Sequence, residues 1–120
     1  MKDVETFDKD VLRQLISELG PEDTAEVLRA FLDDTNRKIA VLDTACPDPV
    51  LVRQEAHSIK SSAGTFGFLT LSMLASEVEQ YALCMSPEQL KKATLSLRKI
   101  IEETVDFARS VLLAANMEIE

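Results

Sequence analysis

The chain lacks tryptophan and has one histidine, two cysteines, three glycines and four prolines among its 120 residues. Cys46 and Cys84 are isolated from each other, and one histidine cannot complete a metal site with them, so we expect no metal centre. No apolar run approaches the roughly 20 residues that span a bilayer. The first residues, from Met1 to Thr6, are too polar for a signal peptide, which predicts a cytoplasmic protein without membrane contact.

Positive charge is also scarce in this chain. Thirteen Lys and Arg residues face 21 Asp and Glu residues, which leaves a net charge of -8. Such a chain repels nucleic-acid backbones, so we expect no nucleic-acid partner. The sequence contains neither a glycine-rich loop that would cradle ATP nor the nucleophile elbow of a serine hydrolase. These two absences argue against a kinase and against a hydrolase.

What the chain does contain points to helices. Its length fits a single domain over residues 1–120, and its 46% of hydrophobic residues can form one core. Most prolines and glycines lie where a helix should begin or end, which predicts an all-α protein. The sequence predicts helices over about 8–19, from 21 to near Cys46-Pro47, over 49–66, over about 71–85, and from the capping box Ser86-Pro87-Glu88-Gln89 through Ala115.

The apolar residues of the third predicted helix indicate how the helices pack. They are spaced 4, 3, 4 and 3 residues apart, as in a helix that packs along a seam: Val52, Ala56, Ile59, Ala63 and Phe66. Four long amphipathic helices joined by short turns must stack antiparallel to bury such seams. We therefore predict an antiparallel four-helix bundle, with the short first helix across one end as a lid.

His57 lies on the face of the third helix that the seam does not use. At 100° per residue the seam lies about 180° to 260° from His57, whereas Arg53, Lys60, Ser61 and Gly64 lie within about 60° of it. An ordinary solvated face carries long side chains of both charges. Cations, a small hydroxyl and a glycine instead allow another surface to approach the imidazole. This arrangement suits a group that becomes negatively charged after it reacts, such as a phosphorylated histidine.

Two further features surround His57. No acidic residue occurs from Ala56 to Ser76, although the whole chain is acidic. If the helical hairpin turns near residues 67 and 68, residues whose numbers sum to about 136 lie at the same height, which places Glu79 beside His57. A carboxylate on one ring nitrogen fixes the tautomer and leaves the other nitrogen as the nucleophile. A shift of one residue in the turn nominates Glu77 or Gln80 instead.

The segment from Ala56 to Phe68, AHSIKSSAGTFGF, resembles the signature of histidine-containing phosphotransfer (HPt) domains. The family pattern is roughly H-x-[IL]-K-G-[SAG]-[SA]-x-x-[LVF]-G, followed by a helix with a leucine-rich face. The stretch is especially similar to the phosphotransfer domain of chemotaxis histidine kinases. The family folds as a four-helix bundle with an extra N-terminal helix, so the resemblance extends over the whole chain.

The resemblance implies a role for several residues. It makes His57 the phosphorylated residue, places Lys60 beside the phosphoryl group, and puts Glu79 where members carry a Gln or Glu that hydrogen-bonds the imidazole. Gly67 matches the glycine that closes the motif at the helix end. Ser61 departs from the pattern, because the family usually has glycine there, and its bulk slightly hinders the approach of a partner.

The activity that the resemblance implies is reversible phosphoryl transfer between aspartates of receiver domains. The chain would then be a phosphocarrier, without a kinase activity or an ATP site of its own. Response-regulator receiver domains and a hybrid histidine kinase are the implied partners, with Mg²⁺ held by the receiver and no cofactor on this chain. We expect the protein to be a monomer. The residues expected to bind the partner, or to support those that do, are Arg53, Ser61, Gly64, Gly67 and Phe68.

Two alternatives stay open at this point. In the first, the chain is a phosphotransfer domain of a larger hybrid or chemotaxis kinase rather than a stand-alone relay protein. The start of the chain and its last predicted helix favour the stand-alone form. The other alternative is a helical bundle that binds a partner without chemistry, and the intact His57 and Lys60 argue against it.

Overall fold

The computed structural model describes residues 7–44 and 46–117. Its α-helices are α1 (Lys9–Leu19), α2 (Pro21–Leu42), α3 (Pro49–Thr65), α4 (Leu69–Tyr81) and α5 (Pro87–Phe107). A 3₁₀-helix, η2 (Ala82–Cys84), continues α4, and a π-helix, η3 (Ala108–Leu113), continues α5. The described residues contain no strand, so the predicted all-α fold is confirmed.

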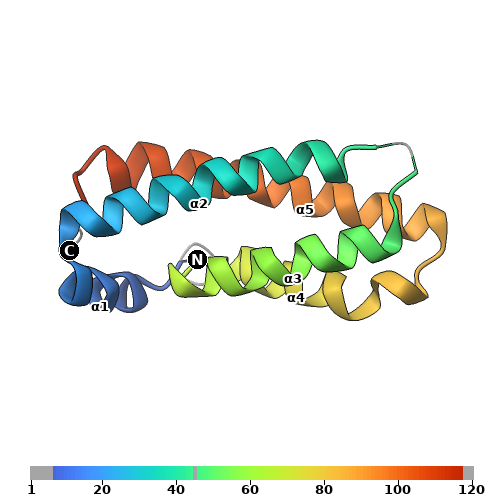
Figure 1. Ribbon diagram of the computed structural model, residues 1–120, viewed down its shortest axis with the longest axis horizontal. Helices are drawn as coiled ribbons and strands as arrows, with labels where there is room; N and C mark the ends of the chain where they lie inside the picture. The colour runs from blue at the N-terminus through green and yellow to red at the C-terminus, as the bar shows by residue number, and fades with distance from the viewer. Residues whose placement is uncertain (1–6, 45, 118–120) are drawn as a thin grey trace.

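The four long helices run alternately in opposite directions, as predicted for the bundle (Figure 1). α2 and α5 lie side by side in one layer, and the hairpin of α3 and α4 forms the other. Two ion pairs tie these elements together: Arg98 of α5 to Asp43, the residue after α2, at 3.0 Å, and Arg109 of η3 to Asp33 of α2 at 3.5 Å. α1 lies at one end of the bundle, beside the first turns of α2.

Local capping interactions explain where α1, α3 and α5 begin. The Asp8 side chain accepts a hydrogen bond from the Asp10 backbone N–H at 3.0 Å, and Asp48 does the same for Val50 at the start of α3. Each bond satisfies a backbone donor that the first turn of a helix leaves unpaired. At α5, Ser86 and Gln89 exchange side-chain-to-backbone bonds of 3.1 and 2.9 Å, which confirms the predicted capping box.

Three predicted helix ends are wrong. α4 ends as an α-helix at Tyr81, four residues before the predicted end at residue 85, and continues only as the 3₁₀-helix η2. α2 ends at Leu42, four residues before Cys46, where Asp43 leaves the helical backbone. Leu42 is the last buried apolar residue of that stripe, so a longer helix would bury nothing more.

The last helix does not continue through Ala115 either, because Ala115 lies in an exposed turn. Asn116 and Met117 adopt left-handed backbone angles there, and the Met117 N–H donates to the Leu112 carbonyl at 2.9 Å. The turn leaves Met117 only 3% exposed. Residues 118–120, which we expected to finish the helix, lie outside the described part of the chain.

The core between the layers draws apolar side chains from every α-helix. Several of the largest are at most 1% exposed, among them Leu12, Leu28, Leu32, Ile59, Leu71, Leu97 and Ile101. Each such side chain contributes roughly 1.5–3 kcal/mol by leaving water. None of the described helices is long and apolar enough to cross a membrane.

All five phenylalanines of the chain gather in one cluster at the α1 end of this core. Phe68 packs against Phe7 and Phe31, with ring centroids 5.7 and 5.9 Å apart, and Phe7 also meets Phe107 at 5.1 Å. Phe66 completes the group against Phe31 at 5.2 Å. The cluster therefore ties the start of the described chain to the turn between α3 and α4.

Gly67 allows this attachment at the turn itself. Its φ of +82° lies in the left-handed region, and a Cβ there would lie 2.5 Å from the Asp8 carbonyl oxygen. The Asp8 N–H donates to the Gly67 carbonyl at 2.8 Å. Only a residue without a side chain lets the backbone before α1 approach so closely.

Candidate functional site

His57 lies near the middle of α3 and points away from the core. Its side chain is 62% exposed, whereas the neighbours Ala56 and Ile59 are at most 1% exposed. This orientation follows from the helical period, because residues 56, 59 and 63 form the buried stripe and His57 lies on the opposite side. The imidazole is thus accessible to a second protein while its helix is fixed by the core.

Glu79 of α4 reaches across the hairpin to this imidazole. Its Oε2 lies 2.7 Å from Nδ1 of His57, and its Oε1 lies 2.7 Å from Nζ of Lys60. One carboxylate therefore contacts both His57 and Lys60 on the α3 face. The carboxylate is partly covered, with 21% of the side chain exposed. The contact selects Glu79 from the three residues that the hairpin geometry nominated, and Glu77 and Gln80 are exposed.

The charge of the Glu79 carboxylate determines which tautomer the neutral imidazole adopts. The hydrogen bond from Lys60, followed by the one from His57, lowers the pKa of Glu79 below its ordinary value of 4.5. Glu79 is therefore ionised at neutral pH and can only accept hydrogen bonds. A neutral imidazole beside it carries its proton on Nδ1, which leaves the lone pair on Nε2 for attack.

Ser72 fixes the backbone next to this site, and sequence reasoning missed it. Its Oγ donates to the Lys60 carbonyl at 3.1 Å, which adds a cross-link between α4 and α3. A serine on a helix is too common a feature to single out, and the hairpin rule places residue 72 at the height of Gly64 rather than of Lys60. The described residues contain no group of three or more His, Cys, Asp or Glu side chains that could hold a metal ion.

The comparison with protein families decides the assignment. The family model described as "Hpt domain" matches residues 26–110, which is more than half of the chain. The chain belongs to the Hpt domain family. No curated protein and no solved structure matches it significantly. Hpt domains take part in histidine phosphotransfer in phosphorelays as phosphocarriers, where they interact with kinases and receiver domains.

The remaining predicted residues of this Hpt domain divide into two groups. Arg53, Ser61 and Gly64 are exposed on the same side of α3 as His57, where a partner can reach them. Gly67 is buried and Phe68 is only 2% exposed, so neither is a partner contact. Both hold the hairpin turn against the segment before α1.

Gly64 differs from Gly67 in what its missing side chain allows. A Cβ at Gly64 would lie 3.6 Å from Ser72 Oγ, an ordinary contact, so packing within the chain does not require glycine there. Because Gly64 has no side chain, nothing projects from the surface beside His57 at that position. Arg53, one turn before His57, makes no ion pair with any residue that the structure describes.

Proposed function

We propose that His57 accepts a phosphoryl group from the aspartyl phosphate of one receiver domain and returns it to the aspartate of another. The observation that carries this proposal is the pair of contacts made by Glu79, which holds Nδ1 of His57 while the ring stays open to a partner. Membership of the Hpt family and the single histidine of the sequence support the same residue.

The transfer step follows from the orientation of the ring. The Nε2 lone pair attacks phosphorus, the bond between phosphorus and the aspartyl oxygen breaks, and that electron pair leaves with the carboxylate. The ring becomes positively charged as the new N–P bond forms, and the Glu79 carboxylate beside Nδ1–H stabilises that charge. The return step reverses these changes. Because such transition states are loose and in line, positioning and charge neutralisation supply most of the catalysis.

Lys60 supplies a cation beside the ring, because it shares the Glu79 carboxylate with His57. It lies three residues after His57, where helical side chains are roughly 5–6 Å apart at Cβ. In the resting site its ammonium group contacts Glu79 at 2.7 Å. A dianionic phosphoryl group on Nε2 would compete for that ammonium group, so Lys60 can stabilise the phosphorylated state. Mg²⁺ held by the receiver would supply further positive charge during transfer.

A receiver would dock on the acid-free segment from Ala56 to Ser76. Receiver active sites are rich in aspartates, and Arg53 and Lys60 offer complementary charge on a protein whose net charge is -8. Gly64→Glu should weaken receiver binding through repulsion and bulk, whereas Gly64→Gln adds similar bulk without charge. Equal affinities of both variants and the wild type, measured by calorimetry, would show that the receiver docks elsewhere.

The direct test is incubation with a phosphorylated receiver domain. The proposal predicts phosphate on this chain that is labile in acid and stable in base, and none on His57→Gln. A bundle that only binds a partner would form the complex and take up no phosphate, which would overturn the proposal. The same chemistry serves a stand-alone relay protein and a phosphotransfer domain of a larger kinase.

A further inference from the structure

The two most exposed large apolar side chains of the described residues lie on the arm of the hairpin that supplies Glu79. Met73 of α4 is 70% exposed and Leu83 of η2 is 55% exposed, whereas the other large apolar side chains at the surface are at most 49% exposed. Met73 precedes Glu79 in the chain and Leu83 follows it. Isolated exposed apolar residues are common, so the position of these two relative to the site decides what they imply.

The helical period places both side chains on the outer surface of the hairpin. At 100° per residue, the buried residues of α4 lie roughly 40–100° to one side of Glu79, and Leu83 and Met73 lie roughly 40–120° to the other side. Glu79 itself points across to the exposed ring of His57, at 2.7 Å. The side of α4 that faces away from the core therefore continues the surface on which the imidazole is exposed.

Met73 projects beside a bare stretch of α3. Its neighbour Ser72 lies opposite Gly64, because a Cβ at Gly64 would lie 3.6 Å from Ser72 Oγ. Gly64 is exposed and has no side chain, so a partner can place an apolar side chain over it and pack that side chain against Met73. Methionine suits such a contact, because its unbranched side chain adapts to different shapes.

Leu83 lies on the other side of the imidazole, toward the start of α3. The antiparallel pairing of His57 with Glu79 places Leu83 near the height of Arg53, which is exposed. An apolar side chain and a cation thus occur together at this end of the surface. The chain from Met73 to Leu83 rises by roughly 15 Å along a helix, a span that an interface of about 800 Å² per partner covers.

We propose that Met73 and Leu83 are the apolar contacts by which this chain recognises a receiver domain, and that they determine which receivers it accepts. The inference rests on the proposed phosphotransfer function, and it extends the docking surface past Ser76 to η2. Both side chains flank the imidazole, so a partner that reaches the ring must also meet them. Lys60 and Glu79 already contact each other within the chain, which leaves the apolar side chains and Arg53 for recognition.

Binding and transfer with a receiver domain charged by acetyl phosphate test this proposal. Met73→Gln and Leu83→Gln each keep a side chain of similar length and remove its apolar end. Each should weaken binding of the uncharged receiver about tenfold in calorimetry, and should raise KM for transfer by a similar factor. The effect should fall on KM and not on kcat. A loss in kcat with KM unchanged would mean that the substitution disturbs the ring, and would overturn a role in recognition.

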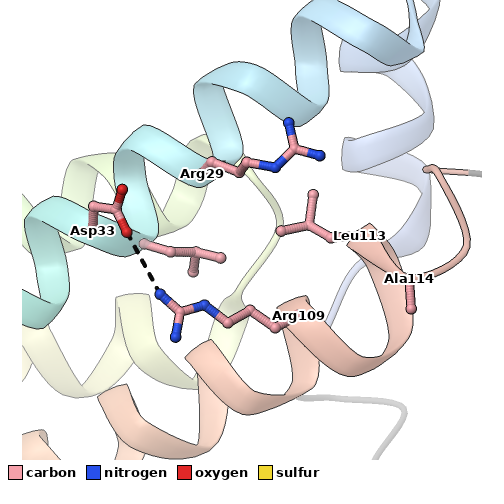
Figure 2. Close-up of a pocket in the computed structure, with 6 residues that line it drawn as sticks. Arg29, Asp33, Arg109, Leu113 and Ala114 are labelled. Carbon is pink, nitrogen blue, oxygen red and sulfur yellow. Dashed lines mark hydrogen bonds and ion pairs between the residues drawn. The ribbon is translucent and has the colours of Figure 1, made fainter.

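Matched variants separate these contacts from general surface effects. Leu95→Gln removes an apolar side chain that is 49% exposed on α5, in the other layer. Arg29→Gln is the control for Arg53→Gln, because Arg29 lines a hollow between α2 and η3, neither of which belongs to the hairpin (Figure 2). Both controls should leave binding and KM unchanged, whereas Arg53→Gln should weaken binding. Equal affinities of the Met73, Leu83 and Leu95 variants would overturn the proposal.

The calorimetric affinity also separates this proposal from the proposed function. A chain that binds the receiver and takes up no phosphate would contradict transfer at His57, and weaker binding of the Met73 and Leu83 variants would still support the docking contacts. Transfer at wild-type KM by both variants would leave the proposed function intact and overturn this inference alone. Absence of any receiver binding would overturn it as well.

Discussion

Glu79 follows His57 by 22 residues in the chain, yet its carboxylate lies 2.7 Å from the ring nitrogen Nδ1. The hairpin of α3 and α4 brings the two residues to the same height. Lys60 occupies the other oxygen of the same carboxylate, also at 2.7 Å. These two contacts make Glu79 the residue on which the orientation of the ring depends.

Replacement of Glu79 should separate its hydrogen bond from its charge. Glu79→Gln retains a side-chain oxygen that can accept from Nδ1–H, whereas Glu79→Ala does not. Glu79→Ala leaves the ring without its orienting partner and should slow transfer roughly tenfold. Glu79→Gln should slow it less. Rapid-quench transfer rates from a phosphorylated receiver provide the measurement, and equal rates for the two variants would contradict the orienting role.

The low pKa of Glu79 predicts how stability depends on pH. Contacts with Lys60 and His57 lower the pKa of Glu79 below 4.5 in the folded state, so the unfolded chain binds more protons there in acid. The stabilisation is therefore present above about pH 4.5 and is lost as pH falls through the folded pKa. Urea unfolding at a series of pH values should show wild type and Glu79→Gln converging in stability below pH 4.5. A constant difference across that range would exclude the effect.

Lys60→Ala should slow transfer with little effect on stability. The lysine is about one-third exposed and its ion pair is near the surface, so it contributes less than about 1 kcal/mol to folding. Lys99→Ala provides a control, because it removes an equal charge from an exposed position of α5. Stopped-flow transfer rates should fall for Lys60→Ala alone. Identical rates for both variants would remove Lys60 from the mechanism.

Ser61→Gly should shorten the lifetime of the phosphorylated protein. We expect the Ser61 hydroxyl to donate to the phosphoryl oxygens, and its loss should outweigh the small gain in access for the partner. Glycine should also cost about 0.5 kcal/mol of stability, because it is a poorer helix former than serine. Ser62→Gly carries the same helical penalty on a different side of α3. Half-lives that are unchanged or longer in Ser61→Gly would show that the hydroxyl has no such role.

Alanine substitutions at the three glycines test how much the contact between Asp8 and Gly67 contributes to stability. Gly20 and Gly67 both have positive φ, but a Cβ at Gly20 meets nothing within 4 Å, whereas one at Gly67 meets the Asp8 carbonyl at 2.5 Å. Gly20→Ala should therefore cost only the roughly 1–2 kcal/mol of the backbone conformation. Gly67→Ala should cost more, because it also displaces Asp8. Gly64→Ala should gain about 0.5 kcal/mol in urea unfolding. Equal losses at Gly20 and Gly67 would mean that the Asp8 contact contributes nothing.

The sequence predicted most of what local interactions determine. Asp8, Asp48 and the pair Ser86–Gln89 cap their helices through bonds that span two or three residues, so their chemistry is visible in the sequence. The end of α2 and the turn at Met117 were predicted wrongly. Both depend on which apolar side chains the core can still bury, and that is a property of the tertiary packing.

The site shows the same division. The exposure of His57 follows from helical period alone, and the contact with Glu79 followed from the position of the hairpin turn, within one residue. The Ser72 hydrogen bond to the Lys60 carbonyl could not be predicted, because it depends on the distance between two helices. The π geometry of η3 could not be predicted either, since it leaves no distinctive pattern in the sequence.

The measurement that tests the central claim most directly is the position of the phosphate on the ring of His57. Nitrogen-15 NMR of the chain after phosphorylation by a receiver distinguishes the two ring nitrogens. Because Glu79 holds Nδ1, we predict that phosphorus is bonded to Nε2 of His57 and that His57→Gln takes up none. Phosphate on Nδ1, or undiminished uptake by His57→Gln, would contradict the account.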